Sequence, residues 1–178
     1  VPVIAGTGSN STSEAIEMTR HAADAGANAS LQVCPYYNKP TQEGLYRHFS
    51  AIAKAVDIPI IIYNIQGRTA VNLETSTLAR LAKEHSNIIG VKEASGNVAQ
   101  MMEVINELPK NFTVLSGDDN LTLPLMALGG KGVISVASNI IPKEMHELCE
   151  YALNGDFEKA RKIHYELLPL FKGIFIET

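Results

Sequence analysis

Residues 58–95 read IPIIIYNIQGRTAVNLETSTLARLAKEHSNIIGVKEAS and contain one complete strand–helix–strand unit. The run 58–63 is almost continuously apolar, which is typical of a strand buried on both faces of a parallel sheet. Residues 73–83 show helical spacing of apolar side chains, and the run 88–93 is again apolar and β-branched. A helix between two such runs predicts a βαβ unit with parallel strands.

The same alternation continues on both sides of this unit. Further strands are predicted over 1–6, 29–34, 112–116 and 132–136. Helices are predicted over 13–26, with Ser13 as N-cap, and over 41–55, with Thr41 as N-cap, and then over 98–108, 121–128, 143–153 and 156–170. Six strands separated by helices predict an α/β fold with a parallel sheet.

Two parallel architectures fit this pattern, a barrel and an open doubly wound sheet. Polar residues follow the ends of all the predicted strands, at 7–10, 35–38, 63–64, 92–93, 116–119 and 135–139. An open sheet gathers its ligand-binding groups at one switch point, whereas a barrel uses the whole carboxyl-terminal face of its strands. The distribution favours the barrel.

Composition narrows the function classes. The chain has 178 residues, of which 46% are apolar and 19% charged, and this content excludes intrinsic disorder. A net charge of −4 without a dense Lys/Arg run argues against a nucleic-acid partner, and the longest apolar run is too short to span a membrane. Cys34 and Cys149 lack CxxC spacing, as reduced thiols of a cytoplasmic protein do. The five histidines fall in or at the ends of predicted helices without metal-ligand spacing, so no metal site is expected.

Lys92 is the sharpest chemical signal, because it interrupts an apolar strand where a charge is costly unless it is paired or used. Desolvation can bring the pKa of a lysine from about 10.4 toward roughly 7–8, which makes the amine a nucleophile suited to Schiff-base formation with a ketone. The alternative is a strand-end lysine paired with a carboxylate such as Asp118. Asp118 and Asp119 also suit the N-terminus of a helix.

Four other side chains are candidates at the same end of the sheet. Tyr63 ends the preceding strand, where a phenol can shuttle a proton, although a tyrosine packed at the barrel rim is the better explanation when Tyr63 is taken alone. Arg68 follows in the loop and can clamp a carboxylate, although most loop arginines are simply solvated. Tyr36 and Tyr37 follow Pro35, a placement more common for packing or interface residues than for catalysts.

Six blocks of the sequence resemble the dihydrodipicolinate synthase family, which belongs to the N-acetylneuraminate lyase superfamily. They are AGTGSNST (5–12), PYYNKPTQEGLYRHF (35–49), YNIQGRT (63–69), GVKEASGN (90–97), LSGDD (115–119) and GGKGVISVASN (129–139). The resemblance implies a (β/α)₈ barrel, of which residues 1–154 carry strands 3–8 and residues 155–178 begin a C-terminal helical region.

The resemblance also implies roles for individual residues. Lys92 would form an imine with pyruvate, Tyr63 would exchange protons near it, and Tyr37 would reach a neighbouring subunit's site to complete a relay. Arg68 would bind the carboxylate of aspartate semialdehyde. The remaining implied positions are Gly117 and Ile134 as backbone groups beside Lys92, and Asn10, Glu14 and Tyr36 at a possible lysine effector site.

The activity implied is a class I lyase that condenses pyruvate with aspartate semialdehyde in lysine and diaminopimelate biosynthesis. It needs no metal or organic cofactor, and the family is usually a homotetramer built from tight dimers. A sugar-acid aldolase, or an incomplete fragment that only binds pyruvate or partner subunits, remains an alternative.

Two departures from the family pattern stand out. Gln66 replaces a common proline, which is expected to loosen the loop that carries Arg68. The first two βα units and the relay threonines that they carry have no counterpart in this sequence, so we expect a natural chain of roughly 250 residues or more.

Overall fold

The computed structural model describes residues 1–177 and contains one five-stranded parallel sheet. Its strands pair in chain order, and they are β1 (Ile4–Gly6), β2 (Ala29–Val33), β3 (Ile60–Asn64), β4 (Ile88–Glu93) and β5 (Thr113–Ser116). A doubly wound sheet would reverse its strand order at a switch point. The uninterrupted order is that of a barrel wall, and it decides between the two architectures.

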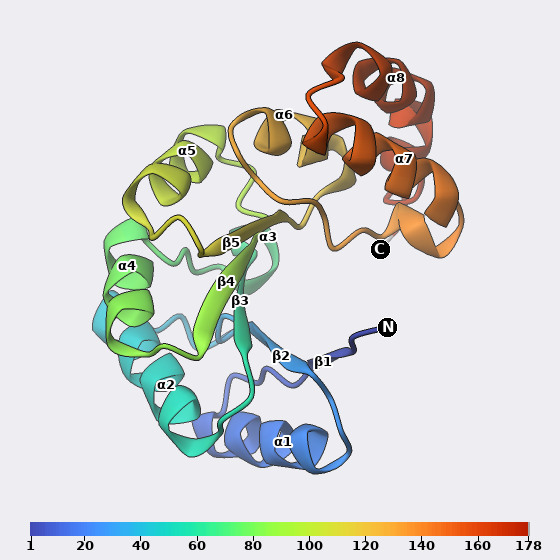
Figure 1. Cartoon of the computed structure of the whole chain (residues 1–178). Coiled ribbons are helices and arrows are strands. Elements are labelled where there is room, and N and C mark those ends of the chain that lie inside the picture. The colour runs from blue at the N-terminus through green and yellow to red at the C-terminus, as the bar shows by residue number, and fades with distance from the viewer. Residues whose placement is uncertain (178) are drawn as a thin grey trace.

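Helices cover the outer side of this wall in an arc, and the inner side of the curve is open in the chain (Figure 1). The arc comprises α1 (Thr12–Asp24), α2 (Gln42–Ala55), α4 (Thr75–Glu84), α5 (Val98–Glu107) and α6 (Thr122–Ala127). Short helical turns follow β3 and β5 as α3 (Gln66–Thr69) and η1 (Asp119–Leu121), and a third, η2 (Ala137–Asn139), follows an isolated bridge at Val133. The last two helices, α7 (Pro142–Leu153) and α8 (Phe157–Gly173), pack against each other and against α6 through Met126, Ala152 and Ala160. None of the helices in residues 1–177 combines the length and the apolar character that crossing a membrane requires.

The predicted strand over 132–136 is wrong in extent. Only Val133 forms a bridge, to Ser116, and the backbone bonds beside it are Ser116 N to Gly132 O and Ile134 N to Ser116 O, both 2.9 Å. The next amides turn away, because those of Val136 and Ala137 donate to the Asp119 carboxylate at 3.2 and 2.9 Å. The segment therefore runs beside β5 for one bridge and then coils into η2.

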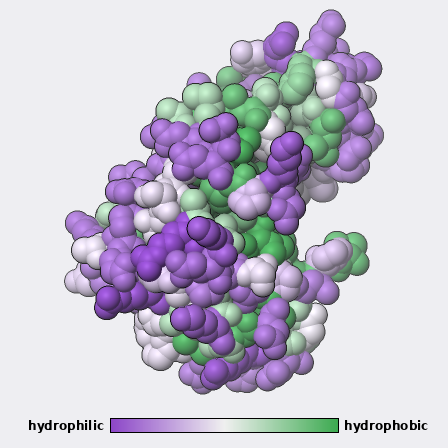
Figure 2. Space-filling view, turned by 60° about the vertical axis from the view of Figure 1, so that its left-hand side comes forward, coloured by the Kyte–Doolittle hydropathy of each residue, from purple (hydrophilic) through white to green (hydrophobic). Residues whose placement is uncertain are grey.

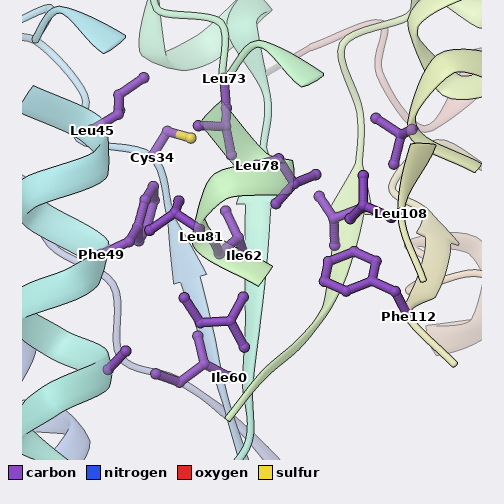
Figure 3. Close-up of a cluster of buried hydrophobic side chains, with 14 of the residues drawn as sticks. Cys34, Leu45, Phe49, Ile60, Ile62, Leu73, Leu78, Leu81, Leu108 and Phe112 are labelled. Carbon is purple, nitrogen blue, oxygen red and sulfur yellow. The ribbon is translucent and has the colours of Figure 1, made fainter. Parts of the chain in front are cut away.

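The core lies between the sheet and the helices. Alternation along β3 turns Ile60 and Ile62 outward, where they pack with Phe49 of α2 and Leu81 of α4 (Figure 3). By the same alternation, Ile61 and Tyr63 of β3 face the inner side of the curve. Apolar surface gathers in the hollow of the molecule (Figure 2). The strand period thus separates a packing face from a face available for chemistry.

The two N-cap predictions have different outcomes. Thr41 is the N-cap of α2, and its hydroxyl accepts a hydrogen bond from Gly44 N at 3.2 Å. Ser13 is not an N-cap, since α1 begins at Thr12 with Ser11 as its N-cap, and the Ser11 side chain makes no capping bond. The serine-rich stretch 9–13 offers several hydroxyls, so sequence alone does not choose among them.

This difference predicts unequal effects of removing the two hydroxyls. Thr41→Ala leaves a helix N–H without its acceptor and is expected to lower the free energy of unfolding by about 1 kcal/mol. The matched variant Ser11→Ala removes no capping bond and should change it by no more than about 0.5 kcal/mol. Urea unfolding of both variants in the full-length protein checks this, and equal losses would contradict the capping assignment.

Candidate active site

Lys92 and Tyr63 are neighbours at the carboxyl ends of β4 and β3. The register pairs Tyr63 with Lys92, so both side chains project from the same face of the sheet. The Lys92 Nζ lies 3.9 Å from the centroid of the Tyr63 ring, and the lysine residue is only 8% exposed. An ammonium over an aromatic face is attracted by the ring quadrupole, which fixes the amine at this position.

The surroundings of Lys92 favour the neutral amine more than water does. Burial lowers the pKa of Lys92, and the carboxylates of Asp118 and Asp119 act in the opposite direction. None of the ion pairs within residues 1–177 involves Lys92, so its ammonium group has no carboxylate in direct contact. A buried lysine without a contact partner is the kind of group that serves as a nucleophile.

Tyr63 is held as a neutral phenol. Burial raises the pKa of its hydroxyl, the negative charge of Asp118 raises it further, and the positive charge of Arg68 lowers it. A neutral phenol both donates and accepts a hydrogen bond, which is what a proton shuttle beside a reacting carbonyl requires.

The backbone directly after β5 packs against the Lys92 stem at Gly117. A Cβ added to Gly117 would lie 2.5 Å from the Ala94 Cβ, closer than a Cβ tolerates, and in tight contact with the Lys92 Cε at 3.1 Å. The Gly117 amide donates to the Glu93 carbonyl at 2.8 Å, and the Ile134 amide donates to the Ser116 carbonyl. Gly117 therefore lies directly after β5 against the Lys92 stem, where a Cβ would clash with Ala94, and Ile134 lies beyond it, bonded to the end of β5.

Arg68 lies on the short helix α3 rather than in an irregular loop. The amides of Arg68 and Thr69 both donate to the Ile65 carbonyl, at 3.1 and 3.0 Å, and Ala70 ends the turn with φ 59°. Gln66 occupies the first position of this turn, which forms without proline there. The guanidinium is exposed, and its charge reaches Tyr63.

Tyr37 is not packed beside Lys92 in this chain. Its side chain is 89% exposed, and its backbone has φ 71°, with φ 45° at Lys39 two residues later. Left-handed backbone at a bulky residue is costly and is found where function or an interface compensates for it.

The stretches after β1 and β2 are tied together at the same end of the sheet. The Asn10 side-chain amide donates to the Tyr36 carbonyl at 3.1 Å, and the Ser9 hydroxyl donates to the Glu14 carboxylate at 2.8 Å. The structure thus brings Asn10 and Tyr36 into contact. Glu14 lies close to them in the chain and is bonded to Ser9, the residue before Asn10.

The pairing of two buried polar residues, Asn64 and Glu93, was not predicted from the sequence. Asn64 and Glu93 directly follow Tyr63 and Lys92, are each 1% exposed, and are joined by a 3.1 Å hydrogen bond from Asn64 Nδ2 to Glu93 Oε2. The sequence marks both as polar residues at the ends of buried strands, but the bond between them depends on the β3–β4 register. Among residues 1–177, no cluster of three His, Cys, Asp or Glu side chains forms a metal site.

Fold and site together define a (β/α)-barrel protein with a buried lysine at the carboxyl-terminal mouth of its strands, facing a tyrosine from the neighbouring strand. The chain belongs to the dihydrodipicolinate synthetase family, whose model matches residues 1–178. A 4-hydroxy-tetrahydrodipicolinate synthase of Syntrophobacter fumaroxidans is 60% identical over all 178 residues, which span 61% of that relative's length.

Solved structures agree with this assignment. A dihydrodipicolinate synthase of Acinetobacter baumannii in complex with pyruvate superposes with a TM-score of 0.96 at 49% identity, covering 100% of this chain and 61% of that one. The enzyme of Cyanidioschyzon merolae with lysine bound has a TM-score of 0.97 at 47% identity, covering 99% of this chain and 60% of that one. These structures support the partial-barrel fold over the described residues.

The electrostatics of the site predict how Lys92 titrates. Burial lowers the pKa of Lys92 below the ordinary value of 10.5 and the Asp118 charge opposes this, so Asp118→Asn is expected to lower that pKa further. The deprotonated amine then persists to lower pH. Competitive acetylation against an N-acetyl-lysine amide standard, followed by peptide mapping across pH 6 to 11, gives the midpoint for Lys92. An unchanged or raised midpoint in Asp118→Asn would refute this arrangement of charges.

Proposed function

We propose that the protein is a Schiff-base lyase that condenses pyruvate with aspartate semialdehyde to give 4-hydroxy-tetrahydrodipicolinate. The observation that carries this proposal is the buried Lys92 amine 3.9 Å from the Tyr63 ring at the mouth of a parallel barrel wall. Membership of the dihydrodipicolinate synthetase family, and a relative's complex with pyruvate, support it.

The chemistry begins at the Lys92 nitrogen. The amine attacks the ketone carbon of pyruvate, and loss of water leaves a protonated imine on Nζ. The iminium withdraws electrons from the adjacent methyl group, which loses a proton and becomes an enamine. The enamine carbon forms a bond to the aldehyde carbon of the second substrate, and the amine of that substrate then attacks the imine carbon and expels Lys92.

Tyr63 supplies and removes protons during these steps. Its hydroxyl, kept neutral by burial and by the Asp118 charge, donates to the oxygen that leaves as water and takes protons back as its phenolate. Gly117 lets the β5 backbone approach the imine, since any side chain at this position would displace Ala94 or the lysine stem. Ile134 presents its backbone at the neighbouring position.

Arg68 selects the second substrate. An exposed guanidinium on a hydrogen-bonded turn near Tyr63 is suited to bind a carboxylate bidentately while the aldehyde end reaches the enamine. This favours an amino-acid semialdehyde over a sugar acid, whose recognition depends on hydroxyl groups. A pyruvate-dependent sugar-acid aldolase is the competing assignment.

Tyr37 and the oligomer complete the proposal. Tyr37 is exposed on the surface, with backbone φ 71°, as expected of a residue that enters the site of a neighbouring subunit. We therefore assign Tyr37 to a proton relay across a dimer within a homotetramer. Asn10, Glu14 and Tyr36 form the candidate lysine effector site beside it, as their shared end of the sheet supports. Residues 155–178 begin a C-terminal helical region, and the free thiols Cys34 and Cys149 fit the cytoplasm.

The decisive experiment is trapping of the imine. Incubation of the full-length protein with pyruvate and borohydride is expected to give one reduced pyruvyl adduct, mapped to Lys92. Lys92→Arg keeps the positive charge, cannot form the imine, and should give no adduct. Absence of an adduct in the folded wild-type protein would rule out the lyase, whereas an adduct with turnover only of sugar aldehydes would identify the competing aldolase.

Arg68→Ala should separate binding of the two substrates. Loss of charge-assisted hydrogen bonds to the carboxylate is expected to raise the KM for aspartate semialdehyde by about 10- to 100-fold, with the KM for pyruvate unchanged. Steady-state kinetics with each substrate varied in turn measures this. Arg161→Ala, which changes an exposed arginine of α8, serves as the control, and equal effects of the two variants would contradict the role of Arg68.

A further inference from the structure

Each catalytic candidate on the inner face of the sheet is followed by a buried polar residue on the outer face. Strand alternation turns Asn64 away from Tyr63, and Glu93 away from Lys92, into the layer between sheet and helices. The β3–β4 register pairs Asn64 with Glu93 as it pairs Tyr63 with Lys92. β3 and β4 therefore end in two neighbouring pairs, Tyr63 with Lys92 on the inner face and Asn64 with Glu93 on the outer face.

The outer pair is fully bonded. Asn64 Nδ2 donates to Glu93 Oε2 at 3.1 Å, and the Ser95 amide donates to Glu93 Oε1 at 2.6 Å. The Asn64 carbonyl also accepts from the Ala94 amide at 2.8 Å. Both carboxylate oxygens thus accept from neutral donors, and the pair fixes the ends of β3 and β4 relative to each other.

The same asparagine closes the loop that carries Arg68. Asn64 Nδ2 donates to Asn72 Oδ1 at 2.9 Å, and Asn64 Oδ1 accepts from the Leu73 amide at 3.0 Å. Asn72 Nδ2 in turn donates to Gln100 Oε1 of α5 at 2.8 Å. The segment 65–72 therefore leaves the sheet at Asn64 and returns to the side chain of the same residue.

We propose that Asn64, Asn72 and Glu93 form a positioning network on the outer face that holds Lys92 beside Tyr63 and holds the Arg68 turn over them. The inference rests on the proposed function for its kinetic consequences, because it concerns the placement of the same three groups. The network makes no contact with substrate, since Asn64 and Glu93 are buried on the opposite face. Within the network, Glu93 places the Lys92 amine, and Asn72 places the Arg68 turn that would bind the substrate carboxylate.

Asn72→Ala tests whether Asn72 holds the turn that carries Arg68, and Asn87→Ala is the matched control. Asn87 is also a half-buried asparagine with two hydrogen bonds, to the carbonyls of Ala53 and Val56, but it lies at the other end of β4. Asn72→Ala is expected to raise the KM for the aldehyde substrate about tenfold and to leave the rate of borohydride-trapped pyruvate adduct unchanged. Asn87→Ala should change stability without changing either kinetic quantity.

Exchanging the amide and the carboxylate between Asn64 and Glu93 tests whether this pair positions Lys92. Asn64→Asp places a carboxylate against Glu93 and is expected to slow pyruvate adduct formation by about 100-fold. Adding Glu93→Gln restores one donor, one acceptor and the original net charge, and should recover at least tenfold of that loss. Circular dichroism and urea unfolding of each variant show whether the fold is retained.

Amide hydrogen exchange gives a readout that needs no turnover. Asn72→Ala should speed exchange at Arg68, Thr69 and Ala70, and Asn87→Ala should not. Equal kinetics and equal exchange in these two variants, or no recovery in the Asn64→Asp/Glu93→Gln protein, would overturn the network. Failure of the wild-type protein to form an adduct would instead remove the proposed function, and the exchange result would still decide the network.

Discussion

The parallel register between β3 and β4 is the constraint on which the rest of the site depends. Because side chains alternate between faces, a slip of one residue would place Lys92 among the core side chains and turn Glu93 toward the hollow. The apolar outer face prevents this slip, since Ile60, Ile62 and Val91 are buried against the helices only in the observed register. Core packing therefore orients the chemistry, and the hydrogen bonds at the strand ends refine it.

A buried lysine is costly to a fold, and this molecule reduces the cost without removing it. The Tyr63 ring and the more distant Asp118 and Asp119 charges stabilise the ammonium, while burial acts against it. A contact carboxylate would have stabilised the charge more fully but would also have kept the amine protonated. The balance leaves an amine that is held in place and able to lose its proton.

Much of this arrangement follows from the sequence, because the spacing of apolar residues locates the strands and a charge within such a run locates Lys92. The apolar runs predicted all five strands, with β4 matched at both ends, and Lys92 was visible as a charge inside such a run. The extent of the sixth strand was not predictable, since a side chain seventeen residues earlier, Asp119, takes the backbone donors of Val136 and Ala137. The Arg68 turn and the Asn64–Glu93 pair were also missed, because both depend on contacts between segments that local pattern does not encode.

The closed base of the 65–72 segment has a consequence for how such a protein diversifies. Since Asn64 bonds to both Asn72 and Leu73, the residues between them can change while the ends keep their places on the barrel. Gly67, beside Arg68, has no atom within 4 Å of the point where a Cβ would stand, so larger side chains fit there without repacking. The sequence of the 65–72 segment can therefore vary while Asn64 and Glu93, at the ends of the strands that carry Tyr63 and Lys92, keep their places.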